Sequence, residues 1–182
     1  MRKAVFILLF TLSAVRSTFA EPDAFMPAWK HVLPLSSTAS DLIKTSVERS
    51  STVEELLQQL EMSGLIVYLT DVMPGAMSGP VSYLTYLSND DKARYLLVRI
   101  DRWRTTPYER IALFGHELQH ALEVAAAPEV RDARTLASLY RRIGWEGQKD
   151  KYETEAAQTV GNRIRGEIAK GQAIRREPGA AR

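Results

Sequence analysis

The sequence predicts one α+β domain, with helices first, a group of strands in the middle and helices again towards the C-terminus. Three short runs of apolar, β-branched and aromatic residues follow one another between positions 65 and 101, and segments with helical periodicity lie on both sides of them. Helices and strands that are segregated along the chain are typical of the α+β class. A length of 182 residues is that of a single domain. We expect a small antiparallel or mixed sheet packed on a helix, with further C-terminal helices.

The N-terminus has the three parts of a secretory signal peptide. Arg2 and Lys3 precede the apolar run 4–12, and residues 18–20 (Thr-Phe-Ala) form a cleavage site of the small-x-small type. The apolar run is too short to span a bilayer comfortably. We therefore predict that residues 1–20 are a cleaved signal and that the protein is exported, to a bacterial periplasm or the extracellular space.

Removal of the signal changes the charge of the chain. Three of the 24 basic residues lie in it and none of the 22 acidic residues does, so 21 basic residues face 22 acidic ones, a net charge of −1. This balance gives no electrostatic reason to expect nucleic-acid binding. No later segment is apolar enough for stable membrane insertion. We expect the domain to occupy residues 21–172 and a flexible basic tail to occupy 173–182.

The absence of cysteine limits the chemistry that is available. An exported domain without disulfides depends on its hydrophobic core, and about 160 residues are enough to build one. Thiolate nucleophiles and thiolate metal ligands are excluded. Any metal must be held by histidine and carboxylate.

The first part of the domain predicts a lead-in followed by two helices. Residues 21–36 contain three prolines and little periodicity, so we expect irregular structure there. A helix is expected over 40–49. The next is expected over 52–62, because Thr52 and Glu55 form a capping-box pattern.

The strand-like runs cover residues 65–72, 81–88 and 94–101. A loop rich in glycine and proline, 73–80, separates the first two runs. The second and third are joined by Asn-Asp-Asp at 89–91, a typical hairpin turn. An antiparallel sheet is the natural expectation.

The segment after the strands has the strongest helix signal in the chain. Thr106 is placed to cap a helix, Pro107 suits its first position, and Glu109 completes a capping box. This helix should extend to about Ala126, before the break at Pro128. Beyond it we expect a helix over 129–143, a loop over 145–151 and a last helix over 152–170.

The strongly signalled helix carries His-Glu-x-x-His, with His116, Glu117 and His120. A spacing of four residues turns an α-helix by only about 40° beyond one full turn, so both imidazoles can reach one point. Glu117 can then face a water at the metal and act as general base, as in helix-borne metalloprotease motifs. The alternative is that two helical histidines share this spacing by accident.

The pattern leaves the third ligand open. A metzincin would place glycine and histidine where Glu123 and Ala126 stand, so that extension is absent. His31 lies in the lead-in and is expected to be a surface residue. A carboxylate on a later helix is favoured, and Glu153 and Glu155 are the two candidates.

From Tyr108 to Glu167 the chain resembles the gluzincin group of zinc metallopeptidases, in which a glutamate on a downstream helix completes the zinc site. Residues 153–156, Glu-Thr-Glu-Ala, are similar to the E-x-E-A pattern of that group. The resemblance implies a zincin-like fold, Zn²⁺ as cofactor and Glu153 as the third ligand. Many relatives orient a histidine with Asp or Asn at the position of Ala157. That departure leaves Glu155 or Glu123 to do so.

The resemblance also implies that the strand over 94–101 lies at a sheet edge and aligns a peptide, although an ordinary inner strand is an equal alternative. Tyr140 and Tyr152 are candidates to stabilise the transition state, as are Arg141 and Arg142. Two tryptophans could line a cleft, but burial in the core is expected for both. They are Trp103 and Trp145.

Together these features predict an exported zinc peptidase that acts on a peptide or protein substrate, with Glu117 as the catalytic residue. Two alternatives stay open. One is a non-catalytic binding module in which the metal is structural, and the other is a metal-dependent amidase that acts on cell-wall material. A structural metal site needs ligands but no general base, so the retention of Glu117 favours an enzyme. The sequence does not indicate the oligomeric state.

Overall fold

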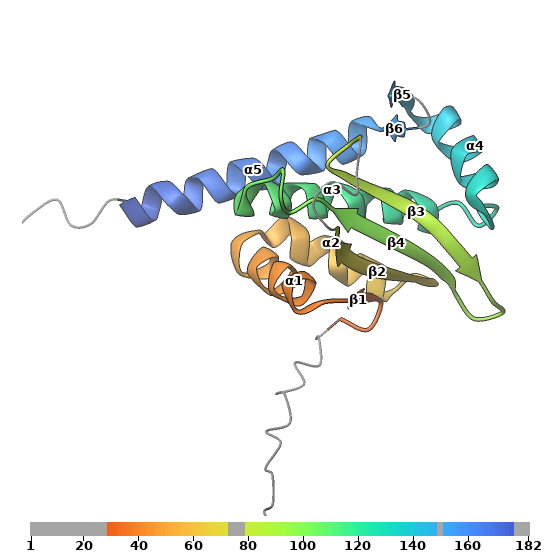
Figure 1. The fold of residues 1–182 in the computed structure, drawn as a ribbon, viewed down its shortest axis with the longest axis horizontal. Helices are drawn as coiled ribbons and strands as arrows, with labels where there is room; N and C mark the ends of the chain where they lie inside the picture. The colour runs from red at the N-terminus through yellow and green to blue at the C-terminus, as the bar shows by residue number, and fades with distance from the viewer. Residues whose placement is uncertain (1–28, 73–78, 149–150, 177–182) are drawn as a thin grey trace, which may run out of the picture.

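The computed structural model describes residues 29–72, 79–148 and 151–176, and within these ranges it confirms the α+β class. A four-stranded mixed sheet packs against helices, and a small two-stranded antiparallel sheet lies near the start of the last helix (Figure 1). The predicted signal peptide at 1–20 lies outside the described residues. In the described part of the chain, no helix is long and apolar enough to cross a membrane.

The N-terminal segment is more ordered than its sequence predicts. β1 (Val32–Pro34) pairs in parallel with β2 (Leu65–Asp71), so the expectation of an irregular lead-in is wrong for these three residues. α1 (Ser37–Arg49) begins three residues earlier than predicted, because the Ser36 hydroxyl accepts a hydrogen bond from the Ala39 N–H.

The second helix, α2 (Ser51–Glu61), is capped by Ser50 and not by Thr52. The Ser50 hydroxyl accepts from the Val53 N–H at 3.2 Å. The Thr52 hydroxyl instead donates to the Glu167 carboxylate at 2.5 Å, which ties α2 to the C-terminal helix. The predicted capping box at Thr52 is therefore incorrect, because its hydroxyl has a tertiary partner.

The sheet has the strand order β1-β2-β4-β3. The predicted hairpin is confirmed: β3 (Ser82–Asn89) is antiparallel to β4 (Arg94–Ile100), and the Asp90 carboxylate accepts from two backbone N–H groups in the turn. β2 and β4 are parallel, so the sheet is mixed, which is one of the two expected forms, and not the antiparallel sheet that the three strand-like runs favoured. β4 is an inner strand, not the edge strand that the family resemblance implied, and the two edge strands are β1 and β3.

α3 (Pro107–Ala125) has the predicted capping box, formed by Thr106 and Glu109. It buries an apolar face against the sheet and the other helices, and it lies beside the last helix in Figure 1. The two helices approach so closely at Gly115 that an added Cβ there would overlap the buried side chain of Ile164. The glycine of the histidine motif is therefore a packing residue.

The C-terminal part departs most from the prediction. α4 (Ala133–Ile143) begins four residues late, because Asp132 is its cap. The predicted loop at 145–151 lies largely in a hairpin of β5 (Trp145–Gln148) and β6 (Lys151–Glu153); residues 149–150 lie outside the described part. The last helix, α5 (Glu155–Arg176), begins three residues after the predicted start and continues into the segment expected to be a flexible tail.

The two tryptophans with a predicted core position are exposed. Trp103 follows β4 and is 58% exposed, with its ring under the Arg102 guanidinium. Trp145 begins β5 and is 46% exposed. The core is built instead from aliphatic residues together with Phe114 and Tyr140.

Candidate metal centre

The structure brings His116 and His120 together on α3. Their Nε2 atoms lie 3.1 Å apart, and their rings meet edge to face. His120 is buried and His116 is half-buried. The spacing of four residues therefore places two imidazole nitrogens at one point, as the sequence predicts.

Glu153 joins this pair from the β5–β6 hairpin. It is the last residue of β6 and not part of a helix, so the expected helical position of the third carboxylate is wrong, but Glu153 is the candidate carboxylate that lies with the two histidines. Its Oε1 atom lies 3.5 Å from His116 Nε2. The backbone of Glu153 is held against Gly144, where a Cβ would overlap the Glu153 carbonyl oxygen.

The separations of these donors suit a four-coordinate zinc ion. Zinc bonds of about 2.0–2.1 Å in a tetrahedron place neighbouring ligand atoms about 3.3 Å apart. The two separations above are 3.1 and 3.5 Å, and the three donor atoms all lie within 4.8 Å of one another. Two neutral imidazoles and a carboxylate are also a common donor set of catalytic zinc. The residues fit the metal.

A second layer of hydrogen bonds orients the histidines. His120 Nδ1 lies 2.8 Å from Glu123 Oε2, which leaves Nε2 free to bind a metal. The Thr154 hydroxyl donates to Glu123 Oε1 at 2.6 Å and also accepts from the Ala157 N–H at the start of α5. Glu123 thus orients His120. Ala157 cannot do so, because it has no polar side chain. Its spacing of three residues from His120 is the sequence signal for this contact.

Glu117 is buried beside the two histidines, with 3% of its surface exposed. Its Oε1 atom accepts a hydrogen bond from the Ser82 hydroxyl at 2.7 Å. Ser82 is the first residue of the edge strand β3 and is itself buried. Sequence reasoning missed Ser82, because nothing in a strand-like run marks one hydroxyl as facing a distant carboxylate.

The charges of the site favour a proton on His116 when no metal is bound. Burial lowers the pKa of His116, but the hydrogen bond to Glu153 and the charges of Glu117 and Glu153 outweigh it and raise that pKa. Burial raises the pKa of Glu153, whereas the hydrogen bond to His116 and the charges of His116 and His120 lower it overall. A metal must therefore displace a proton from this pair.

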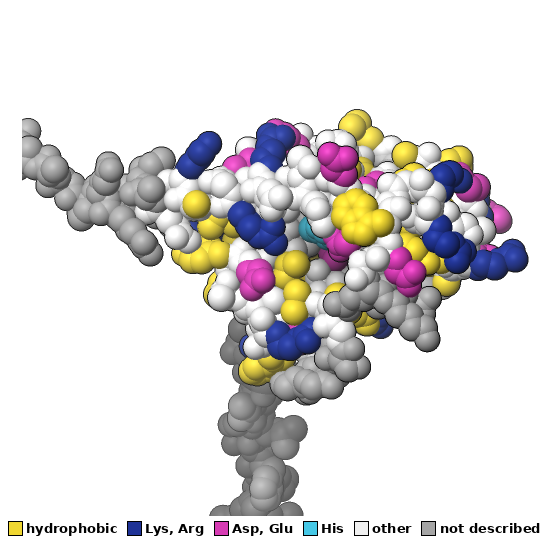
Figure 2. All heavy atoms as spheres, turned by 90° about the horizontal axis from the view of Figure 1, so that it is seen from above, with side chains coloured by type: hydrophobic (Ala, Val, Ile, Leu, Met, Phe, Trp, Pro, Cys, Tyr) yellow, Lys and Arg dark blue, Asp and Glu magenta, His cyan; other side chains and the backbone are white. Residues whose placement is uncertain are grey.

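A cleft of about 300 Å³ opens beside the site, between β3, α4 and β6. In the space-filling view, a histidine side chain reaches the surface next to acidic and large hydrophobic side chains (Figure 2). Glu117, His120 and Glu153 line the cleft at one end. The remaining wall is largely apolar and aromatic and is formed by Pro80, Ser82, Tyr83, Leu84, Thr85, Tyr86, Ala133, Leu136, Ala137, Tyr140 and Tyr152.

Of the four candidates for transition-state stabilisation, only the two tyrosines line this cleft. The Tyr140 hydroxyl donates to the His120 carbonyl oxygen at 3.1 Å, and burial raises the pKa of Tyr140 well above its usual range. Tyr140 is therefore a support for α3. Tyr152 is half-buried and stacks on Tyr140. Arg141 bonds to Ser138 and Arg142 pairs with Glu129, so neither points into the site.

The other two ligand candidates lie apart from the centre. His31 Nδ1 lies 2.9 Å from the Leu60 carbonyl oxygen, near the end of α2. Glu155 is exposed on the first turn of α5 and does not belong to the group of converging donors. The structure thus separates Glu153 from Glu155, which the sequence left as alternatives.

Comparisons with protein-family models, with curated proteins and with solved structures return no match for this chain.

Proposed function

We propose that this chain is a zinc-dependent peptidase of gluzincin type, with His116, His120 and Glu153 as ligands and Glu117 as the general base. The observation that carries the proposal is the convergence of the three donor atoms within 4.8 Å beside a buried fourth carboxylate. A zinc ion held there would supply Lewis-acid polarisation of the scissile carbonyl and would acidify the attacking water.

Glu117 is well placed for proton transfer. It lines the cleft, and one of its oxygens accepts a hydrogen bond from the Ser82 hydroxyl. The other oxygen can accept a proton from the attacking water and pass it to the leaving amine. Ser82 fixes the rotamer of the base, so the carboxylate has one orientation before substrate arrives.

The edge position of β3 supports an extended peptide as the substrate. Residues 82–86 of β3 line the cleft, and the outer side of this strand has no partner strand within the described residues. Unpaired N–H and C=O groups of such a strand can bind a peptide backbone. An exposed edge strand therefore favours a peptidase over an amidase that acts on cell-wall material, because the substrate of such an amidase has less extended peptide backbone.

The buried position of Glu117 also supports an enzyme in preference to a module with a structural metal. A structural zinc site closes with four protein ligands, whereas here a non-ligand carboxylate is kept beside three. Burial of a carboxylate is costly, and a single hydrogen bond from a neutral hydroxyl offsets only part of that cost, so a carboxylate kept here favours a functional role. Export through the N-terminal signal remains part of the proposal.

The test compares the mature wild type with Glu117→Gln and Ser82→Ala on a peptide library. We expect Glu117→Gln to keep about one zinc per chain and to lose at least about 10²-fold in hydrolysis, since a general base contributes 10²–10⁴-fold. Ser82→Ala should keep zinc and lose about tenfold in kcat, because the base loses one hydrogen bond. Undiminished hydrolysis by zinc-loaded Glu117→Gln would refute the catalytic assignment.

A further inference from the structure

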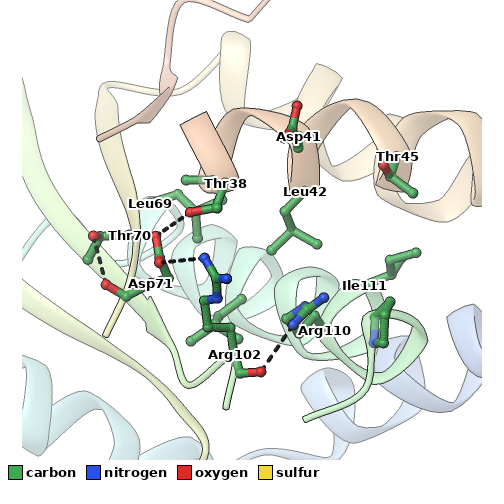
Figure 3. Close-up of a pocket in the computed structure, with 13 residues that line it drawn as sticks. Thr38, Asp41, Leu42, Thr45, Leu69, Thr70, Asp71, Arg102, Arg110 and Ile111 are labelled. Carbon is green, nitrogen blue, oxygen red and sulfur yellow. Dashed lines mark hydrogen bonds and ion pairs between the residues drawn. The ribbon is translucent and has the colours of Figure 1, made fainter. Parts of the chain in front are cut away.

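A second cavity lies at the carboxyl ends of β2 and β4, between α1 and the first turns of α3 (Figure 3). Its volume is about 250 Å³, and it shares no lining residue with the cleft beside Glu117. The carboxyl ends of parallel strands are a common place for ligands in sheets of this kind. The proposed peptidase mechanism makes no use of this cavity.

The acidic groups around the cavity are already neutralised or turned away. The Asp71 carboxylate accepts from the Ser36 and Thr38 hydroxyls at 2.6 and 2.7 Å, and Arg102 lies 3.6 Å from its other oxygen. Asp41 of α1 also lines the cavity, but its carboxylate points away from Arg110 in Figure 3. Asp71 and Arg102 therefore cancel each other in charge, and neither needs a ligand.

Arg110 is the second basic residue that lines the cavity, beside Arg102. Its Nη1 donates to the Arg102 carbonyl oxygen at 3.1 Å. Within the part of the chain that the structure describes, no carboxylate forms an ion pair with it. A guanidinium has five N–H donors in a planar fork, so most of the donors of Arg110 are available to an anion that enters the cavity.

The rest of the cavity is apolar, with a few hydroxyls. Leu42 points from α1 towards α3 in Figure 3, and Leu69, Ile100 and Ile111 close the inner side. A phosphate or sulfate would leave this apolar surface unused. A carboxylate with a short hydrocarbon body would satisfy both the guanidinium and the apolar wall.

We propose that this cavity binds a small aliphatic carboxylate of the size of one apolar amino acid. The carboxylate lies against Arg110 and the hydrocarbon packs on Leu42 and Ile111. The volume of about 250 Å³ is slightly below the usual range for drug-sized ligands, which suits a ligand this small. The carboxylate can belong to a free acid or to the C-terminal residue of a peptide.

The test is a titration of the metal-free, full mature chain with 4-methylpentanoate, followed by the NMR signals of leucine and isoleucine methyl groups. Metal-free protein is used because a carboxylate could also bind a zinc ion. We expect saturable shifts at Leu42 and Ile111 with a dissociation constant of about 1 mM. The neutral 4-methylpentanamide should bind at least about tenfold more weakly, since it cannot form charge-assisted hydrogen bonds.

Two variants and one control make the titration decisive. Arg110→Gln should weaken 4-methylpentanoate binding by about tenfold or more, and Leu42→Phe should abolish it by filling the cavity while Arg110 is kept. Arg141→Gln removes one exposed positive charge on α4 and should leave binding unchanged. Binding of N-acetyl-leucine as tight as that of 4-methylpentanoate would identify a peptide C-terminus as the source, and weaker binding would identify a free acid.

Three results would overturn the proposal: equal binding by Arg110→Gln, equal binding of the amide, or shifts confined to Leu136 in the cleft. None of these results depends on zinc or on hydrolysis, so the peptidase proposal and this one fail separately.

Discussion

Replacement of Gly144 by alanine should displace Glu153 and weaken zinc binding without unfolding the domain. The backbones of the two residues are in direct contact across the start of the β5–β6 hairpin. A Cβ at position 144 would overlap the Glu153 carbonyl oxygen and would lie 3.1 Å from both the Glu153 carbonyl carbon and Thr154 Cγ2. To restore ordinary contacts, the Glu153 backbone must move by about 1 Å.

The size of the effect follows from the role of Glu153. Disturbance of the residues that orient metal ligands costs about 10–100-fold in affinity. A shift of about 1 Å in a ligand that the hairpin holds should have an effect of the same size, which corresponds to about 1.4–2.7 kcal/mol. The fold should survive, because neither Gly144 nor Glu153 belongs to the core cluster.

The assay is competition for zinc with a chromophoric chelator, combined with a thermal melt of the metal-free protein. Gly166→Ala is the matched control: its Cβ would have no neighbour within 4 Å on α5. The control should keep the zinc affinity of the wild type and gain roughly 0.5–1 kcal/mol in stability. Wild-type zinc affinity in Gly144→Ala would refute the reasoning that this hairpin delivers the third ligand.

Four further predictions concern the support of α3 and the protons of the site. Arg94→Met should lower the free energy of unfolding by about 3 kcal/mol in urea denaturation, because its buried guanidinium donates to the carbonyl oxygens of Val124 and Ala127 at the end of α3; a loss below about 1 kcal/mol would contradict that role. Glu123→Gln should weaken zinc binding by about 10–100-fold while the fold is kept. Zinc affinity should fall as the pH decreases through the pKa of His116, because the proton competes with the metal. This pKa is raised above the ordinary value of about 6.5, so the fall should begin above that pH. The sign is opposite for the stability of the metal-free protein: protonated His116 contributes stability that is fully present below about pH 6.5 and is lost as the pH rises through its folded pKa. Thermal melts of metal-free protein between pH 6 and 9 measure this, and a melting point that rises across that range would contradict it.

The parts of the fold that the sequence predicts well are those determined by local contacts. Thr106, Pro107 and Glu109 lie next to the helix that they start, so the beginning of α3 was predicted to the residue. The Asp90 carboxylate accepts hydrogen bonds from backbone N–H groups within three residues, so the hairpin turn can also be predicted from the local sequence. The histidine pair depends only on helical spacing.

The parts that the sequence did not predict depend on distant residues. β1 is a strand because it pairs with β2, about 35 positions later, and its three residues have no strand signal of their own. The Thr52 hydroxyl does not cap α2, because it donates a hydrogen bond to Glu167, which lies 115 positions away. Ser82 meets Glu117 across 35 positions.

The candidate site could be predicted from the sequence only in part. Glu153 was identified by its resemblance to a family pattern, but its placement on a helix was wrong because the pairing of β5 with β6 holds it in a strand. Such a short hairpin has neither the alternation nor the length that marks a strand in a sequence. Glu123 was one of two candidates to orient a histidine, and only the folded helix shows that its carboxylate reaches His120 Nδ1.

The most direct test of the central claim is X-ray absorption spectroscopy of the zinc-loaded mature protein, together with the zinc stoichiometry of Glu153→Gln and Glu155→Gln. We expect one zinc per chain, bound by two imidazoles and a carboxylate, with zinc lost in Glu153→Gln and kept in Glu155→Gln. A wild type without stoichiometric zinc, or zinc bound without histidine, would contradict it.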